Sequence, residues 1–362
     1  MLNLRELIHR VEYGVVGSSF EAQWLLFLLN QRYYPAQCRE RLRLKPPALL
    51  KLNLNNRFPR CYPTRRLTQD GSLYYGPFPS QAAAERFASE FLDFFKVRRC
   101  VEDLDPNPTH PGCVYSQMRM CLAPCFAGCT DAEYQNEVGR VVEFLDAQGL
   151  ILLRSLEADR SRASEALEFE QAAKIHRKIE KVNEVLRQKP ELTRNLRDLH
   201  AVVVQRGAEP KSVAFFRVSA GEICGPANLS LDENVSSPVP LDEQLHKLLD
   251  SRAIDAPRDK PSKALRESPL GPCASPQKFE ATTKPASPPS AQMQEGVPTH
   301  VNDPTSQRGR GVPCLPPWEH LSLLARWYYS SFREGELVML NPDQTIPHSR
   351  LIRICRKLLA TA

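Results

Sequence analysis

The stretches FFKVRRC (residues 94–100) and PGCVYSQMRMCLAPC (residues 111–125) bring four cysteines into one short segment. Cys100, Cys113, Cys121 and Cys125 follow one another at steps of 13, 8 and 4 positions. Four soft thiolates suit zinc or an iron–sulfur cluster. Zinc sites commonly use two C-x-x-C pairs, which this segment lacks, and wider gaps fit a cluster. The spacing therefore predicts a metal site of either kind, with buried structural cysteines as the alternative.

The basic side chains around these cysteines, Lys96, Arg98, Arg99 and Arg119, predict that the thiolate form is favoured over the thiol.

Composition limits the compartment and the partners. The 362 residues hold 48 Lys and Arg against 42 Asp and Glu, a formal charge of +6, which permits nucleic-acid binding without proving it. The N-terminus MLNLRELIHR has no apolar core of signal-peptide length, and we find no apolar run long enough to span a membrane. We therefore expect a cytoplasmic protein with no membrane partner. Eleven cysteines, an odd number, also argue against a disulfide framework.

The hydrophobic pattern predicts an α+β multidomain protein. Helices are expected at 20–33, 81–95, 318–332 and 348–360, and along 131–188 with a turn near Glu168 and Phe169. The first, dense in Leu and aromatic residues, is expected to be buried, and Ser80 is expected to cap the second. Strands are expected at 201–205, 212–219 and around Ile223, with a hairpin turn at Ala220-Gly221. Residues 251–317 hold 13 of the 31 prolines and few large apolar side chains, so they are predicted to be a disordered linker.

A coiled-coil seam is predicted in LEFEQAAKIHRKIEKVNEVL (residues 167–186). Apolar residues recur there at steps of 3, 4, 3 and 4, which is the pattern of a helical hairpin or coiled coil. These residues are Ala172, Ile175, Ile179, Val182 and Leu186. An ordinary packed helix is the alternative reading.

The cysteine segment resembles the UvrC family, the nuclease subunit of bacterial nucleotide excision repair. The stretch FPRCYPTRRLTQDGSLYYGPFPS (residues 58–80) is similar to the basic stretch that precedes the cysteines in that family. The resemblance runs from about Leu4 to Leu231, and more faintly from Trp318 to the C-terminus. It implies that Cys100, Cys113, Cys121 and Cys125 hold a [4Fe–4S] cluster, with Cys129 spare and zinc as the alternative.

The segment 167–186 also resembles the UVR motif, a two-helix unit that in the family pairs with its counterpart on UvrB. The resemblance implies that UvrB is a partner, with Phe169 as the aromatic anchor. The matching positions are Leu167, Phe169, Glu170, Ala172, Ala173 and Ile179.

Both nuclease centres of the family are expected to be missing. Residues 1–60 are similar to the later half of a GIY-YIG domain without its catalytic hairpin, and Leu26 or Phe27 stands where the family has its metal-binding Glu. Glu21 lies almost two helical turns earlier. The second nuclease centre of the family is an RNase H-like region. The carboxylates considered for it here, Asp198 and Asp232, are expected to be surface or turn residues, so no catalytic residue is assigned.

Basic and aromatic side chains predict contact with DNA, expected to be damaged duplex. Arginine and lysine supply phosphate contacts, and tyrosines stack on exposed bases. The turn at Gly76-Pro77 is expected to present the two tyrosines; the alternative is that they are core residues and the arginines are merely solvated. The predicted residues are Arg57, Arg60, Arg65, Arg66, Tyr74, Tyr75, Arg98 and Arg99.

The predicted domain plan has five parts. They are a partial GIY-YIG-like domain (1–60), a basic iron–sulfur segment (61–130), a UVR hairpin (131–190), a UvrC-like β/α region (198–250 with 318–362) and the linker (251–317). The expected function is a UvrC-like repair protein that binds UvrB and DNA without cutting. The alternatives are an active excinuclease-type endonuclease with a non-standard or partner-supplied site, and a decaying gene product that keeps only a folding remnant.

Overall fold

The computed structural model describes residues 8–101, 104–230, 243, 315–341 and 343–360. Apart from residues 8–14, which have no regular secondary structure, these belong to one compact unit. The predicted linker lies outside the described residues except for 315–317, and so do Asp232 and most of 231–250. Among the described helices, none combines the length and the apolar character needed to cross a bilayer.

A first antiparallel sheet has the order β2-β1-β3-β4. Its strands are β1 (Ala48–Leu52), β2 (Cys61–Thr64), β3 (Leu73–Phe78) and β4 (Arg194–Asn195). Helix α3 (Gln81–Leu92) packs on one face through Ala84, Phe87 and Phe91. The Ser80 hydroxyl accepts the N–H of Ala83 at 3.1 Å, so the predicted N-cap is confirmed. The 3-10 helix η3 (Leu196–Asp198) follows β4 directly.

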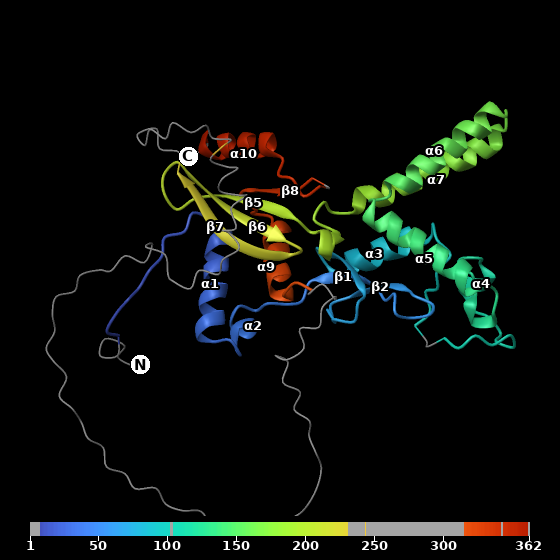
Figure 1. The fold of residues 1–362 in the computed structure, drawn as a ribbon, viewed down its shortest axis with the longest axis horizontal. Helices are drawn as coiled ribbons and strands as arrows, with labels where there is room; N and C mark the ends of the chain where they lie inside the picture. The colour runs from blue at the N-terminus through green and yellow to red at the C-terminus, as the bar shows by residue number, and fades with distance from the viewer. Residues whose placement is uncertain (1–7, 102–103, 231–242, 244–314, 342, 361–362) are drawn as a thin grey trace, which may run out of the picture. The chain divides into compact units, whose positions relative to one another are not determined.

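Three helices complete this first core. They are α5 (Asp131–Asp146), α6 (Leu150–Glu165) and α7 (Phe169–Gln188), and Figure 1 shows α6 and α7 side by side. The predicted turn near Glu168 is confirmed. A second break was not predicted: Gln148 and Gly149 adopt left-handed φ values of +52° and +77°, which end α5 and start α6.

A second antiparallel sheet has the order β7-β6-β5-β8. Its strands are β5 (Ala201–Arg206), β6 (Ser212–Ser219), β7 (Glu222–Ser230) and β8 (Glu336–Met339). The predicted strands and the turn at Ala220-Gly221 are confirmed, whereas β8 was not predicted.

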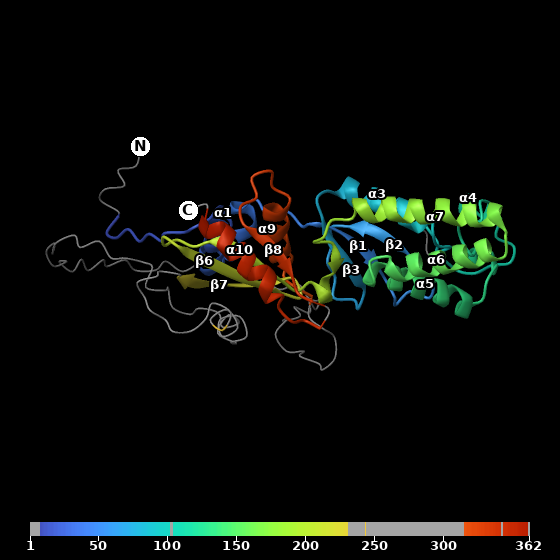
Figure 2. The same ribbon diagram turned by 90° about the horizontal axis from the view of Figure 1, so that it is seen from above.

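Alternate residues of β5 face two different cores, as a pleated strand requires. Ala201 and Val203 pack with α1 (Ser19–Tyr33) and α9 (Trp318–Tyr328), whereas Val202 and Val204 pack with α10 (His348–Ala360). Figure 2 gives a second view of this sheet and its helices. A central strand buried on both faces explains why 201–204 reads as a continuous apolar run.

The mixed helix and sheet content fits the predicted α+β class, but two details of the prediction are wrong. Helix 20–33 is buried on one face only, since Leu26, Leu28 and Leu29 are exposed. The predicted boundary between residues 60 and 61 falls inside a sheet, because β1 pairs with β2. Helices α1 and α2 (Cys38–Arg41) instead contribute to the core of the second sheet.

Candidate functional sites

The cysteine segment folds back on itself. Its short helices are α4 (Val114–Gln117) and the 3-10 helix η2 (Pro124–Phe126). The N–H of Leu122 donates to the carbonyl of Lys96 at 3.0 Å, and the N–H of Asn107 donates to the carbonyl of Cys125 at 2.9 Å. These two bonds bring the chain around Cys100 back to the chain around Cys121 and Cys125.

The four predicted thiols are neighbours. Burial, together with the nearby thiols of Cys100, Cys113 and Cys125, raises the pKa of the Cys121 thiol to about 11. The pKa of Cys125 is raised in the same way. The prediction that basic neighbours favour the thiolate is therefore wrong for these two side chains. Across the described ranges, no group of three or more His, Cys, Asp or Glu side chains has the geometry to hold a single metal ion.

Arg98 and Arg99 support this segment and do not project into solvent, so their prediction as DNA contacts is corrected. Arg98 is buried, and its Nε donates to the carbonyl of Phe58 at 2.9 Å while its Nη1 lies 3.8 Å from the Cys100 Sγ. Arg99 donates to Asp93 at 2.7 Å. Both guanidinium groups are committed to the protein itself.

Tyr74 and Tyr75 were predicted to stack on bases, and the structure contradicts this. Each is only 1% exposed, because Gly76 and Pro77 continue β3 and do not form the expected presenting turn. Tyr75 belongs to the core under α3, and Tyr74 to the core under α1 and α9. A buried ring cannot stack on a nucleobase without unfolding the sheet.

The other predicted arginines have side chains at or near the surface. Arg57 forms a two-pronged pair with Asp131 at 2.7 and 2.9 Å, which offsets its charge. Arg60 lies over the ring of Tyr62. Arg65 donates to the carbonyl of Pro46 at 2.8 Å, and Arg66 is exposed. Arg60, Arg65 and Arg66 are thus the predicted residues that can still reach a phosphate.

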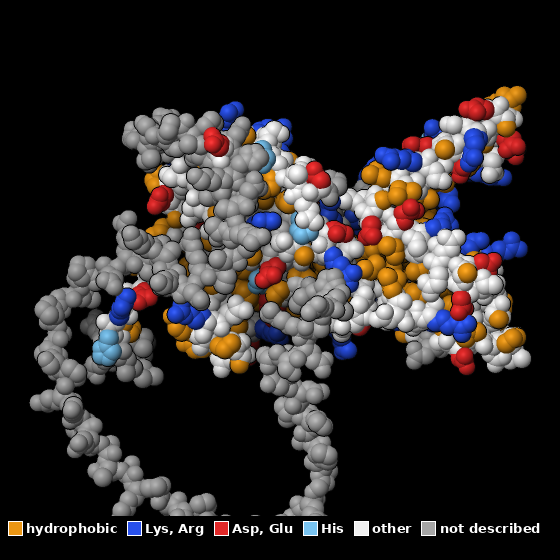
Figure 3. Space-filling view, viewed as in Figure 1, with side chains coloured by type: hydrophobic (Ala, Val, Ile, Leu, Met, Phe, Trp, Pro, Cys, Tyr) orange, Lys and Arg blue, Asp and Glu red, His pale blue; other side chains and the backbone are white. Residues whose placement is uncertain are grey.

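The end of the α6–α7 hairpin presents apolar side chains to solvent. Leu167, with φ +62°, is 71% exposed and Phe169 is 67% exposed, and Figure 3 shows hydrophobic atoms at this end. Glu170 and Ala173 are exposed, and Ala172 is half-buried. Ile179 is only 5% exposed and packs in the first core, so its prediction as a partner contact is wrong.

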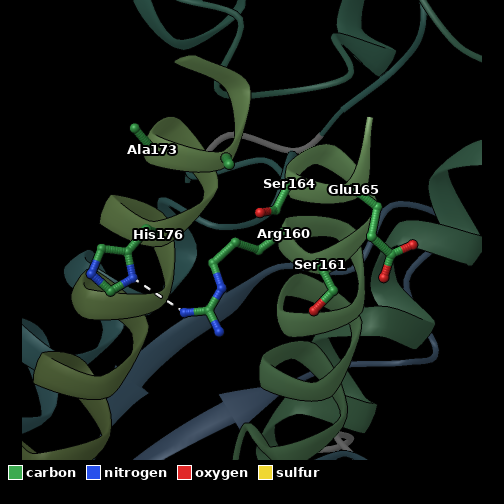
Figure 4. A pocket seen from close by; sticks show the side chains of 7 residues that line it. Arg160, Ser161, Ser164, Glu165, Ala173 and His176 are labelled. Atoms are coloured by element: carbon green, nitrogen blue, oxygen red, sulfur yellow. Dashed lines mark hydrogen bonds between the residues drawn. The ribbon is translucent and has the colours of Figure 1, made fainter. Parts of the chain in front are cut away.

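A cavity of about 490 Å³ lies between α6 and α7 near this end, as Figure 4 shows. The small side chains of Ala172 and Ala173 leave it open on the α7 side. Arg160 Nη1 lies 3.4 Å from His176 Nδ1. The remaining walls are Ser161, Ser164 and Glu165.

The side chains considered for nuclease chemistry are placed as follows. Glu21 is buried and accepts the N–H of Gly17 at 2.8 Å, and burial raises its pKa. Phe27 belongs to the core and Leu26 is exposed. Asp198 is exposed at the end of η3. Glu21 therefore binds the main chain just before α1, and its carboxylate is not exposed to a substrate.

Two family models match the chain. Residues 48–144 match "UvrC/Cho excinuclease, middle domain", and residues 151–185 match "UvrB/uvrC motif". Over these two regions the chain is similar to the UvrC family. The first match begins at β1 and ends within α5, and the second covers most of the α6–α7 hairpin.

Curated relatives of the UvrC family agree with these matches. The chain is 29% identical over 223 residues to UvrABC system protein C of Ruminiclostridium cellulolyticum, which covers 60% of this chain and 36% of the relative. It is 30% identical over 225 residues to that of Carboxydothermus hydrogenoformans, covering 61% and 36%. For Methanothermobacter thermautotrophicus the values are 28% over 267 residues, 73% and 43%. The chain thus spans well under half of these relatives, and no solved structure matches it.

Proposed function

We propose that this chain is a UvrC-like factor of nucleotide excision repair that binds UvrB through the α6–α7 hairpin, binds DNA, and has no nuclease activity of its own. The UvrC middle domain and the UvrB/UvrC motif support the repair context. The proposal that it binds without cutting rests on two points. Glu21 is buried, and Leu26 or Phe27 stands where the family has its metal-binding Glu.

The observation that carries the proposal is the pair Leu167 and Phe169. Large apolar side chains that are about 70% exposed beside a cavity cost free energy in water, and burying them in a complex recovers it. An exposed aromatic ring at the end of a hairpin is a typical interface anchor. Neighbouring Glu170 and Ala173 are open to the same partner.

The cysteine segment is proposed to hold a [4Fe–4S] cluster, with zinc as the alternative. Four thiols supply the soft ligand set that either group requires. The N–H of Ala123 points to the Cys121 Sγ at 3.3 Å, and such bonds to a ligand sulfur stabilise its charged form. The cluster would brace the segment that Arg98 and Leu122 tie to the first core.

Contact with DNA is proposed to use arginines Arg60, Arg65 and Arg66, since their side chains lie at or near the surface and no described carboxylate pairs with them. Phosphate contacts of this kind supply affinity without reading sequence.

Binding to purified UvrB, measured by biolayer interferometry, tests the partner assignment. We expect the wild-type chain to bind and Phe169→Ala to weaken binding at least tenfold, the range of a hot-spot residue. Phe332→Ala is the matched control, because Phe332 is 89% exposed and lies in the α9–β8 connection. Equal losses in both variants, or no binding by the wild type, would refute the assignment.

Nicking of a lesion-bearing duplex separates the proposal from the alternative, an active excinuclease-type endonuclease. The purified chain is incubated with Mg²⁺ or Mn²⁺, alone and with UvrB. We expect no incision above a metal-free control. Metal-dependent incision that tracks with the protein through purification would establish the endonuclease alternative.

A further inference from the structure

A second hollow lies where three distant parts of the chain meet, and its volume is about 270 Å³. One wall is the α2–β1 connection with Arg43 and Lys45. A second wall is Arg65, just after β2, with the β3–α3 junction at Ser80. The third wall is the outer side of α9 at Arg326. We call this hollow the basic cleft.

The basic cleft concentrates positive charge. Four of its lining residues are cationic, Arg43, Lys45, Arg65 and Arg326, and none of its lining residues is Asp or Glu. Like charges held together in one hollow repel one another, and binding an anion relieves that repulsion. A concave surface with one sign of charge also focuses its field on the space inside.

Two of these cations are held in place by main-chain oxygens. Arg65 Nη1 donates to the carbonyl of Pro46 at 2.8 Å, and Arg326 Nη2 donates to the carbonyls of Leu42 and Arg43 at 3.2 and 2.9 Å. A guanidinium carries five N–H donors, so each keeps donors for a ligand. Carbonyl partners orient the two groups and leave their full charge uncompensated.

The other two cations are exposed and have no ion pair with any residue that the structure describes. Arg43 adopts φ +50°, and Lys45 is followed by Pro46 and Pro47, whose rings restrict the backbone. The short connection therefore presents both side chains with little freedom in the main chain.

The N-terminus of helix α3 adds hydrogen-bond donors and partial positive charge to the basic cleft. Ser80 caps its N-terminus at the cleft, and its first turn contains no acidic residue. The free N–H groups and the dipole at this end favour an anion. Phe78 and Tyr329 supply an apolar floor.

We propose that the basic cleft binds a backbone phosphate of DNA. This inference rests on the proposed DNA binding and gives it a location that includes Arg43, Lys45 and Arg326. The volume lies just below the range of about 300–1,000 Å³ typical of small-molecule pockets, so it suits a phosphate and part of its sugar. Arginine forks match phosphate oxygens in two-pronged geometry, and Lys45 adds a point charge. Contacts to phosphate carry no information about the base, so we expect this contact to be independent of sequence.

The test uses the full chain and a fluorescently labelled duplex, with anisotropy measured between 50 and 300 mM salt. The test variant is Arg43→Gln with Lys45→Gln, because these side chains support no described contact in the fold. The matched control is Arg177→Gln with Lys178→Gln on α7, which removes the same net charge from an exposed surface. Arg43→Lys with Lys45→Arg keeps the charge and tests rescue. Thermal unfolding of each variant checks that the fold is intact.

We expect the cleft variant to bind DNA about tenfold or more weakly, with a salt slope shallower by roughly 0.9 for each phosphate that the variant no longer neutralises. The α7 control and the charge-preserving variant should stay within about threefold of the wild type. If the wild type binds DNA and the cleft variant binds as tightly as the α7 control, the assignment of DNA binding to the basic cleft is wrong. The proposal that the chain binds DNA would then still stand.

If the wild type fails to bind DNA at low salt, both the proposed DNA binding and this inference are overturned. The last part of the test adds inorganic phosphate as a competitor of DNA. Displacement of DNA by millimolar phosphate at constant ionic strength, abolished in the cleft variant, supports the site. If phosphate raises the melting temperature of wild type but not of the cleft variant while DNA affinity is equal in both, the cleft is a free-phosphate site and the inference is wrong.

Discussion

Tyr134 and Arg98 are joined across the first core by a buried hydrogen bond, in which the Arg98 main-chain N–H donates to the Tyr134 hydroxyl at 2.9 Å. The same hydroxyl donates to the carbonyl of Pro59 at 2.9 Å. Tyr134 is fully buried, and its ring meets Phe58 edge to face. One phenol on α5 therefore fixes both the β1–β2 connection and the chain that leads into the cysteine segment.

Replacing Tyr134 with Phe should lower the free energy of unfolding by about 2 kcal/mol. The ring packing survives, but a buried N–H and a buried carbonyl lose their partner, which costs about 1–3 kcal/mol. Urea unfolding followed by circular dichroism measures the change. Tyr33→Phe is the control, because Tyr33 is exposed and should change stability by less than about 0.5 kcal/mol. Equal stabilities of the two variants would contradict this account of Tyr134.

Gly149 is predicted to be intolerant of alanine. It adopts φ +77°, and a Cβ there would lie 2.7 Å from Leu186 Cδ1 on α7. The strained backbone and the clash together should cost about 2 kcal/mol or more. Gly139 in α5 is the matched control, since a Cβ there meets nothing within 4 Å. Gly139→Ala should stabilise the protein by about 0.5–1 kcal/mol, so the two substitutions should shift the urea midpoint in opposite directions. A neutral Gly149→Ala would show that the α5–α6 break has room to adjust.

The parts of the fold that sequence predicts are those set by local patterns. Ser80 before an apolar period of 3.6 residues indicates the start of α3, and Ala220-Gly221 between two β-rich runs indicates the β6–β7 turn. The break at Gln148 and Gly149 was missed because α5 and α6 are both helical in pattern. What separates them is a close approach to Leu186, more than 30 residues away in sequence.

The site residues were harder to predict, because the exposure of a side chain depends on which elements cover its strand in the fold. Tyr74 and Tyr75 read as a presented aromatic pair, yet β3 is covered on both faces and takes one ring into each core. Arg98 likewise reads as a surface cation, yet it is buried and donates to the carbonyl of Phe58. The basic cleft could not be seen at all, since Arg43 and Arg326 are 283 positions apart. Only the fold brings them together.

His320 should make the protein less stable as pH falls. It is buried against the rings of Trp24 and Phe27, its Nδ1 accepts the N–H of Ile223 at 3.1 Å, and burial lowers its pKa to about 4. Near pH 6.5 the unfolded chain takes up a proton on this imidazole and the folded chain does not. Protonation of His320 therefore does not lower the free energy of unfolding above pH 6.5. Between pH 6.5 and about 4 it lowers that free energy by roughly 3 kcal/mol.

Urea unfolding between pH 4 and 8 checks the dependence on His320. His320→Asn keeps an acceptor near the Nδ1 position and should flatten the curve between pH 4 and 6.5. His176→Asn is the control, because His176 is exposed on α7 and its replacement should leave the slope unchanged. A wild-type curve that is flat over this interval would show that protonation of His320 does not oppose folding.

Anaerobic purification should yield a brown protein with about four iron and four sulfide per chain if the four cysteines hold a [4Fe–4S] cluster. Cys121→Ser is expected to lose most of the iron and the visible absorbance, since it replaces the thiol that neighbours the other three. Cys129→Ser and Cys224→Ser are matched controls, as both are partly exposed cysteines outside the proposed ligand set. Both should keep the wild-type iron content.

The controls also decide between ligand sets and between metals. Loss of iron in Cys129→Ser with retention in Cys100→Ser would move the fourth ligand from Cys100 to Cys129. One zinc per chain with no sulfide would establish the zinc alternative, because a mononuclear site binds no inorganic sulfur. A colourless, metal-free protein whose stability is unchanged by serine at Cys100, Cys113, Cys121 and Cys125 would reduce these residues to packing. The turns at Arg119 and Ala123, with φ +58° and +60°, would then need no metal to hold them.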